Sequence, residues 1–150
     1  MGNTVKQEEI PNEDNLYCYV HQANIHPKTG QPRAAAFQNT PKEGDNLSCD
    51  WSKYSTPEET KSRVGKQYKF SSKEFKNPNL FGVIGFKVEI LRSEDFSQEV
   101  KHDPIFNDPE IDGQPNNTAH AIIIGEKDEE VRLKMVDVCE WIILPIQGVL

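Results

Sequence analysis

Three segments of the chain have residue patterns that are typical of β-strands. Residues 16–20 are aromatic and β-branched, residues 47–51 form a second short segment, and residues 80–91 form the longest one. The core face predicted for this longest segment consists of Leu80, Ile84, Phe86, Val88 and Ile90. Gly82 and Gly85 interrupt the pattern, which indicates a bulge or a close backbone contact. These patterns therefore predict three strands.

Capping residues mark the start of two helices. Thr56 precedes Pro57, and Glu59 completes a capping box, so a short helix is predicted to end near Gly65. Asp128 is the predicted cap of a C-terminal helix over residues 128–144. Met135 and Cys139 lie on the apolar stripe of this second helix, and such a stripe is typical of core packing rather than of ligand binding.

Polar segments separate these elements and define the predicted organisation. Residues 1–14 are expected to be flexible, and residues 15–150 are expected to form a single domain. Residues 67–79 are predicted to be a polar insert and residues 102–119 a long loop, whereas the apolar run 121–124 is predicted to be a central strand covered on both faces. Together these elements predict an α+β fold with a small mixed or antiparallel sheet.

Charge and hydropathy exclude several classes of function. The 150 residues include 17 Lys and Arg against 24 Asp and Glu, which gives a net charge of −7. An acidic chain disfavours broad binding to nucleic acid or to anionic membranes. No segment has the roughly 20 apolar residues of a membrane span. Because the N-terminus has no apolar leader segment, we expect a cytoplasmic protein without a membrane partner.

The cysteines and the missing motifs indicate neither a metal nor a cofactor. Cys18, Cys49 and Cys139 are odd in number and far apart, so we expect three reduced, half-buried thiols. No CxxC or CxxH pair indicates structural zinc. The sequence also has no glycine-rich phosphate-binding motif and no GxSxG nucleophile motif.

The histidines are the main candidates for chemistry, and all stand at the edges of predicted elements: His21, His26, His102 and His120. Residues at loop and strand ends on a rigid sheet often carry function. His21 and His120 are predicted to face one cleft and, with Asp103, to act in general acid–base catalysis, since imidazole titrates near neutral pH. Two alternatives stay open, namely a metal site formed by the same three residues and four unrelated surface histidines.

Two further groups of residues are candidates for catalysis or binding. Ser48 and Cys49 lie beside Asp50, and a Ser–His–Asp triad here requires the fold to bring a histidine close. The cations of a basic segment with aromatic residues between them are Lys61, Arg63, Lys66, Lys69, Lys73 and Lys76. This segment predicts either a nucleic-acid-binding surface or, more commonly, a solvated face.

Several short motifs resemble those of a family of small bacterial proteins for which no activity is established. The similar stretches include Val20-His21, Ala36-Phe37, Thr40-Pro41-Lys42, Leu47-Ser48, Gly82-Val83, Asp103-Pro104 and His120-Ala121. They cover most of residues 16–142, although Cys18 and Cys49 stand where that family tends to have Arg and Val. The resemblance implies no reaction. The predicted ligand-binding residues are His26, Phe37, Ser48 and His102.

Two functions are compatible with these observations. We expect a small cytoplasmic bacterial accessory or interaction protein that acts with a protein partner encoded nearby, for example in a defence or toxin-type system. The alternative is an enzyme whose histidine-lined cleft acts on a nucleotide or nucleic acid, through ADP-ribosyltransferase-like or phosphodiester chemistry. The distance between His21 and His120 tests the enzyme hypothesis, because a general acid or base must reach its proton directly or through one water.

Overall fold

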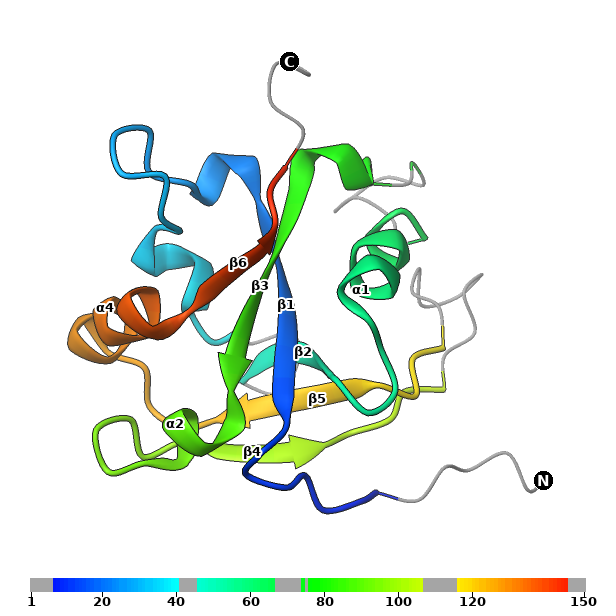
Figure 1. Ribbon diagram of the computed structural model, residues 1–150, viewed down its shortest axis with the longest axis vertical. Helices are drawn as coiled ribbons and strands as arrows, with labels where there is room; N and C mark the ends of the chain where they lie inside the picture. The colour runs from blue at the N-terminus through cyan, green and yellow to red at the C-terminus, as the bar shows by residue number, and fades with distance from the viewer. Residues whose placement is uncertain (1–6, 41–45, 67–73, 75, 107–115, 146–150) are drawn as a thin grey trace.

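The computed structural model describes residues 7–40, 46–66, 74, 76–106 and 116–145. Its strands form one antiparallel six-stranded sheet in the order β4-β5-β2-β1-β3-β6 (Figure 1). The strands are Asn15–His21 (β1), Leu47–Trp51 (β2), Phe81–Lys87 (β3), Glu99–His102 (β4), His120–Ile124 (β5) and Glu140–Ile143 (β6). The predicted α+β class is confirmed.

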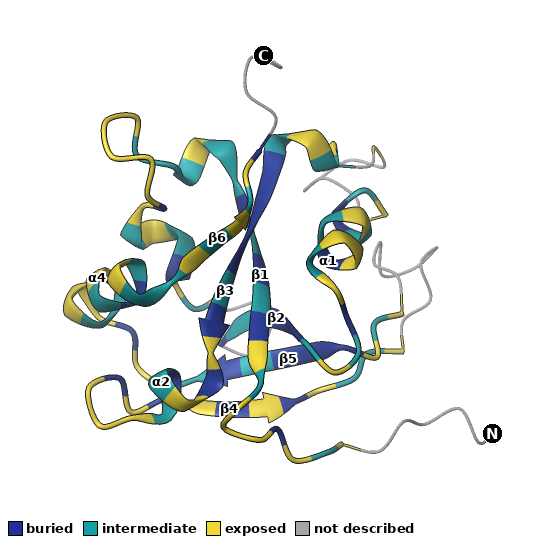
Figure 2. Ribbon diagram, in the orientation of Figure 1, coloured by how far each residue is buried: buried dark blue, intermediate teal, exposed yellow. Residues whose placement is uncertain are grey.

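Helices and short 3-10 turns flank this sheet. The α-helices are Pro57–Val64 (α1), Val88–Arg92 (α2) and Glu129–Val138 (α4), and the 3-10 turns are Gln22–Asn24 (η1), Ala34–Phe37 (η2) and Pro78–Leu80 (η4). In Figure 1, α1 lies to the right of the strands, and α4 packs beside η2 on the left. The middle strands of the sheet are therefore covered from two sides, and Figure 2 shows the burial along β3 and β5.

The two-residue period of the strands separates an apolar face from a polar one. Leu16 of β1 pairs with Trp51 of β2, and both side chains are buried in the main hydrophobic core. Cys49 lies on this same core face. Ser48 and Asp50 alternate with these residues, so they lie on the opposite face, where α1 packs. This alternation places polar chemistry beneath α1.

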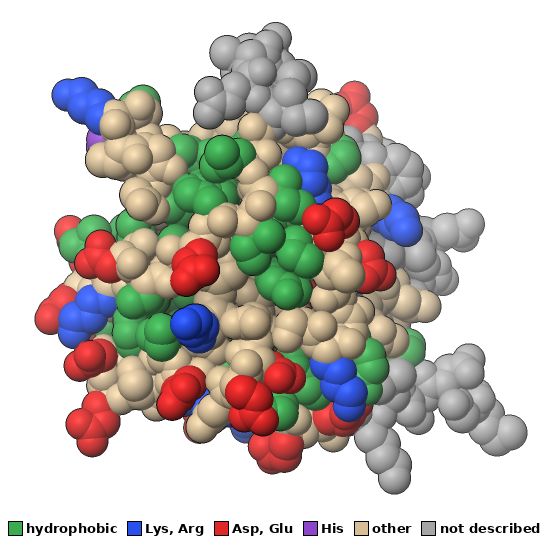
Figure 3. All heavy atoms as spheres, viewed as in Figure 1, with side chains coloured by type: hydrophobic (Ala, Val, Ile, Leu, Met, Phe, Trp, Pro, Cys, Tyr) green, Lys and Arg blue, Asp and Glu red, His purple; other side chains and the backbone are tan. Residues whose placement is uncertain are grey.

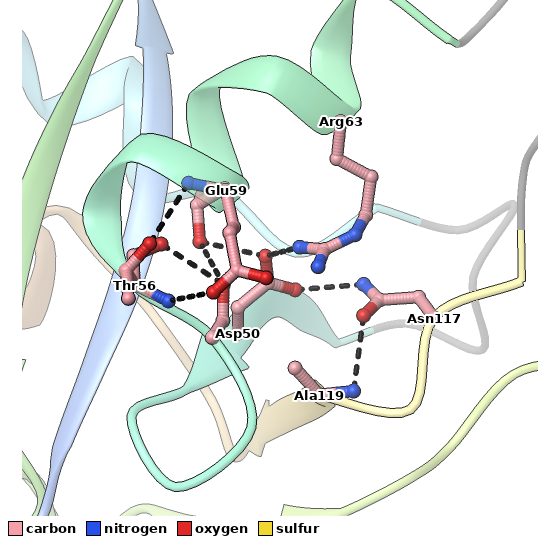
Figure 4. A network of polar contacts seen from close by, with 8 residues as sticks. Asp50, Thr56, Glu59, Arg63, Asn117 and Ala119 are labelled. Carbon is pink, nitrogen blue, oxygen red and sulfur yellow. Dashed lines mark hydrogen bonds and ion pairs between the residues drawn. The ribbon is translucent and has the colours of Figure 1, made fainter.

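The predicted helix starts are confirmed by their hydrogen bonds. Thr56 Oγ1 accepts from the Glu59 N–H at 3.1 Å, and Glu59 Oε1 accepts from the Thr56 N–H at 3.0 Å (Figure 4). At the start of α4, Asp128 Oδ1 accepts from the Val131 N–H at 2.9 Å. Each carboxylate or hydroxyl thereby satisfies a backbone donor that the helix itself leaves unpaired.

The segment 80–91, predicted to be one strand, is a strand followed by a helix. β3 ends at Lys87, and α2 begins at Val88. Both Val88 and Leu91 are fully buried, because their three-residue spacing places them on one side of the helix. The predicted close contact at the glycines is confirmed, since a Cβ atom on Gly82 would lie 2.6 Å from the carbonyl oxygen of Ile143.

The C-terminal helix is shorter than predicted. It ends at Val138, and residues 140–143 form β6 on the edge of β3 instead of continuing the helix to residue 144. A short apolar run fits either period, so pairing with β3 decides its structure. Met135 is fully buried, as predicted, whereas Cys139 follows the last helical turn.

Two of the three cysteines are joined, so the expectation of three reduced thiols is wrong. The pairs Leu16–Trp51 and Tyr17–Asp50 define a register that places Cys18 directly opposite Cys49. The two Cα atoms are 4.6 Å apart, and the side chains form a disulfide. Cys139 is free and half-buried. The disulfide links β1 to β2 at the position that follows the last backbone pair, Tyr17–Asp50.

We expect the disulfide to stabilise the fold substantially. Its partners are 31 residues apart, and removing a crosslink of this length costs about 2–4 kcal/mol of unfolding free energy. Urea denaturation of the double variant Cys18→Ala/Cys49→Ala measures this loss, with Cys139→Ala as the control for replacing a cysteine. Equal unfolding free energies for the double variant and the oxidised parent would contradict this role.

The described part of the N-terminal segment is packed, although it was expected to be flexible. Ile10 is buried in the core, and its carbonyl oxygen accepts from Arg92 Nη1 at 2.7 Å. Trp51 Nε1 donates to Asp14 Oδ2 at 2.9 Å. Residues 7–14 therefore form part of the folded unit, and residues 1–6 lie outside the described residues.

The remaining loop predictions are corrected in part. Residues 99–102 form β4, so His102 ends a strand instead of beginning a loop. β5 lies between β4 and β2, with Ala121 and Ile123 fully buried, and the predicted central strand is confirmed. Residues 107–115 of the predicted loop and residues 67–73 and 75 of the predicted insert lie outside the described residues.

Candidate functional site

Three neighbouring strands bring Ser48, His120 and Asp103 together. Asp50 of β2 pairs with His120 of β5, so Ser48, two residues before Asp50, lies on the same face as His120. Asp103 directly follows β4, and its N–H donates to the His120 carbonyl oxygen at 2.8 Å. The sheet register therefore aligns a hydroxyl, an imidazole and a carboxylate that are far apart in the sequence.

The hydrogen bonds of His120 determine which ring nitrogen carries the proton. Nδ1 lies 2.9 Å from the carbonyl oxygen of Asp103, and a carbonyl oxygen accepts hydrogen bonds only. Nδ1 must therefore donate, which leaves Nε2 of the neutral ring as an acceptor. Nε2 lies 3.0 Å from Ser48 Oγ, so in this tautomer it can accept a hydrogen bond from the serine hydroxyl. This arrangement suits removal of the hydroxyl proton by His120.

The Asp103 carboxylate supplements this contact. Its Oδ2 atom lies 3.4 Å from His120 Nδ1, while about half of the Asp103 side chain is exposed to solvent. The His120 side chain itself is only 10% exposed. An imidazolium formed at His120 would therefore have a carboxylate within reach, as in a Ser–His–Asp triad.

Ser48 also lines a cleft. β1 and β2 are paired at Leu16 and Tyr17, and beyond the disulfide the two strands separate. The cleft at this end has a volume of about 520 Å³. Its walls come from the end of β1, the residues around η2, the start of β2, and the two residues Lys76 and Phe81. Because His120 is not among the lining residues, the hydroxyl stands between the cleft and the base.

The buried carboxylate of Asp50 connects the strands of the site to helix α1. Asp50 Oδ2 accepts from Thr60 Oγ1 at 2.8 Å and pairs with Arg63, and both partners belong to α1 (Figure 4). Asp50 Oδ1 accepts from Asn117 Nδ2 at 2.7 Å, and Asn117 Oδ1 in turn accepts from the Ala119 N–H at 3.0 Å. This network joins β2, α1 and the residues that lead into His120.

His21 is not brought to His120. His120 lies opposite Asp50, which pairs with Tyr17 of β1, and His21 lies four residues further along β1. Four strand residues span roughly 13 Å, which is too far for a shared proton-transfer site. His21 Nδ1 accepts from the Ala23 N–H at 2.9 Å, and its ring packs edge-on against Phe81. His21 does line the cleft.

Two other predicted ligand-binding residues, His102 and Phe37, are buried within the fold. His102 is fully buried between Trp51 and Tyr54, accepts from the Glu8 N–H at Nδ1, and lies 2.7 Å from the Thr118 carbonyl oxygen. Its ring has no access to a ligand. Phe37 is a core residue that also contributes to the cleft wall.

His26 belongs to a surface loop away from the Ser48–His120 pair. Its Nδ1 accepts from the Lys28 N–H at 3.2 Å, two residues later in the same loop. The residues that line the cleft do not include His26. The structure therefore gives it a local role in the turn.

The basic segment is partly used within the fold. Lys61 Nζ donates to the carbonyl oxygens of Pro78 and Phe81, and burial lowers the pKa of this lysine. Arg63 is paired with Asp50. Lys66 is exposed, and Lys69 and Lys73 lie outside the described residues. Two of the proposed nucleic-acid contacts, Lys61 and Arg63, therefore already have protein partners.

Other reactive groups do not form a second site in the described ranges. Burial raises the pKa of the Cys139 thiol to about 11, so little of the reactive thiolate is present near neutral pH. Among residues 7–40, 46–66, 74, 76–106 and 116–145, no three His, Cys, Asp or Glu side chains are placed to hold a metal ion. None of the described helices is long and apolar enough to cross a membrane.

Comparisons with known proteins identify no relative. No family model, no curated protein and no solved structure matches the chain significantly. The resemblance to a family of small bacterial proteins therefore stays a sequence-based prediction. The candidate site is defined by the contacts among Ser48, His120 and Asp103 alone.

Proposed function

We propose that this protein is a hydrolytic enzyme in which Ser48 is the nucleophile and His120 is the general base. The observation that carries the proposal is the 3.0 Å contact from Ser48 Oγ to Nε2 of His120, at the wall of a cleft. A base within this distance activates a serine hydroxyl, which is otherwise a weak nucleophile.

The reaction needs no group beyond the substrate and water. As Ser48 Oγ bonds to the electrophilic atom of an ester, its proton moves to His120 Nε2. The bond to the leaving alcohol breaks, and the leaving oxygen takes this proton. Water then attacks the covalent intermediate with His120 as base, and Ser48 regains its proton. Asp103 acts as a positioning residue through its contacts with Nδ1.

This proposal keeps one part of the enzyme hypothesis and changes another. Phosphodiester chemistry is compatible with a serine nucleophile, because an ester of phosphorus accepts the same attack as an ester of carbon. ADP-ribosyltransferase-like chemistry has no specific support among the described contacts. His120 works with Ser48 in place of His21, and His21 becomes a residue of the cleft wall.

Reaction with a fluorophosphonate tests the proposal without knowledge of the substrate. Such a probe forms a stable bond with an activated serine, and we expect one adduct per chain by intact mass spectrometry. Ser48→Ala abolishes the adduct, whereas Ser62→Ala, which removes an exposed hydroxyl of α1, leaves it unchanged. An adduct that persists in Ser48→Ala would contradict the assignment of the nucleophile.

A second function, interaction with a protein partner, is favoured by the surface around β6. This strand lies at one edge of the described sheet, and Ile142 and Leu144 are 45% and 58% exposed. Figure 3 shows hydrophobic side chains gathered over this part of the molecule, while carboxylates lie near α2. An exposed apolar edge strand is suited to pairing with another chain.

Co-expression with the product of an adjacent gene tests this second function. We expect the complex to purify as one species and to be weakened by Ile142→Lys. Leu133→Lys, which changes an exposed apolar residue of α4, is the matched control. Loss of binding in both variants, or in neither, would argue against an interface at β6.

A further inference from the structure

The cleft beside Ser48 has an unusual charge for this protein. The chain has 24 acidic residues and a net charge of −7, yet none of the described residues that line the cleft is an aspartate or glutamate. Lys76 and His21 both belong to the lining. A lining that contains an ammonium group and, among its described residues, no carboxylate favours an anionic ligand over a cationic one.

An aromatic wall stands next to this positive charge. Phe81 packs edge-on against Tyr19, with ring centroids 5.5 Å apart, and against His21, with centroids 4.9 Å apart. Lys76 Nζ lies 5.8 Å from the centre of the Tyr19 ring. Planar rings of this kind stack on a flat ligand such as a nucleobase. The wall and the ammonium group thus present an aromatic surface and a cation side by side.

The remaining lining supplies neutral hydrogen-bonding groups. Asn24, Gln38 and Thr40 line the same cleft, and their amides and hydroxyl both donate and accept. A volume of about 520 Å³ lies within the usual range for small-ligand pockets. The cleft therefore suits one compact ligand that combines a flat ring, polar edges and an anionic group.

We propose that this cleft binds a nucleoside phosphate ester, with the base against Tyr19 and Phe81 and the phosphate near Lys76. The inference rests on the proposed function, because it names the substrate class of the same site. Ser48 Oγ then bonds to phosphorus while the phosphorus–oxygen bond to the leaving alcohol breaks. His120 transfers the serine proton to that alcohol, which leaves the nucleotide bound to Ser48 through its phosphate. Water, with His120 as base, then breaks the bond between Ser48 Oγ and phosphorus, which releases the nucleotide and restores the serine hydroxyl.

A single nucleotide fits these observations better than a nucleic-acid strand. The aromatic wall and the lysine lie within one cleft, whereas a strand-binding surface extends cations and stacking rings along a groove. Of the basic segment, Lys61 and Arg63 are already paired with protein groups. The cleft therefore takes one base and its phosphate.

Calorimetric titration of the full-length protein with adenosine 5′-monophosphate tests this inference. We expect binding, and we expect adenosine and inorganic phosphate each to bind at least about tenfold more weakly, since each lacks one of the two contacts. Lys76→Gln and Tyr19→Leu each weaken binding of the monophosphate by about tenfold, which is the scale of one charge-assisted hydrogen bond or one stacked base. Lys87→Gln, at the far end of β3, is the control and leaves binding unchanged.

The outcomes distinguish this inference from the function on which it rests. Absence of binding, or unchanged binding in both cleft variants, overturns the nucleotide site even if the fluorophosphonate labels Ser48. Binding of the monophosphate without any label on Ser48 supports the ligand class and overturns the hydrolytic function. Binding of an oligonucleotide but not of the monophosphate overturns the single-nucleotide site. If Tyr19→Leu fails to fold by circular dichroism, Lys76→Gln alone decides.

Discussion

His120→Gln is expected to slow the reaction of Ser48 with a fluorophosphonate by about 10²–10⁴-fold, which is the usual contribution of a positioned general base. Glutamine retains polar atoms but cannot remove the proton from the serine hydroxyl. The distance from His120 Nε2 to Ser48 Oγ, 3.0 Å, is within reach for direct proton transfer. The measurement is the second-order rate of labelling, followed by intact mass spectrometry.

Two comparisons make this result specific. His26→Gln changes a histidine outside the cleft and should leave the labelling rate unchanged. Asp103→Asn should have a smaller effect than His120→Gln, because the backbone carbonyl oxygen of Asp103 still accepts from Nδ1 at 2.9 Å. Equal rates for His120→Gln and the parent protein would rule out His120 as the base.

Asp50→Ala is expected to lower the free energy of unfolding by about 3–5 kcal/mol, which is the cost of breaking a buried ion pair from one side. The side chains of Asp50 and Arg63 are only 9% and 17% exposed. Removal of the carboxylate leaves the guanidinium without its partner and also removes the oxygen atoms that accept from Thr60 and Asn117. Urea denaturation of the variant and the parent measures the difference.

A double-mutant cycle separates the ion pair from the other contacts. In an Arg63→Ala background, Asp50→Ala should lower the free energy of unfolding by less than in the parent protein. In that background no buried guanidinium is left without its carboxylate partner. Asp95→Ala, which removes an exposed carboxylate, serves as the control and should change stability by no more than about 0.5 kcal/mol. Additive costs in the cycle would contradict coupling between Asp50 and Arg63.

Local sequence signals were sufficient for the elements that they define strongly. The capping box at Thr56 and the cap at Asp128 depend on side chains three residues from their backbone partners, so the sequence contains the whole interaction. Strand β2 has the predicted bounds for the same reason, since a short run of period two is bounded by polar residues. In contrast, β6 depends on an unfilled edge of β3, and no local pattern encodes that edge.

The candidate site was only half visible in the sequence. His120 and Asp103 were predicted as catalytic residues and Ser48 as a ligand-binding residue, but the pairing of Ser48 with His120 requires the register between β2 and β5. The sequence predicted that His21 and His120 share one cleft, because both stand at strand ends. The disulfide has a weak signal that was missed, since Cys18 and Cys49 each occupy a core-facing position of neighbouring predicted strands.

A crystal structure of the protein after fluorophosphonate treatment tests the central claim most directly, because it shows both the reacting atom and its surroundings. The account predicts continuous density from Ser48 Oγ to phosphorus, with the adduct in the cleft beside Tyr19 and with His120 Nε2 still within hydrogen-bonding distance of Ser48 Oγ. An unmodified Ser48, with the label on another residue or with His120 turned away from the cleft, would contradict it.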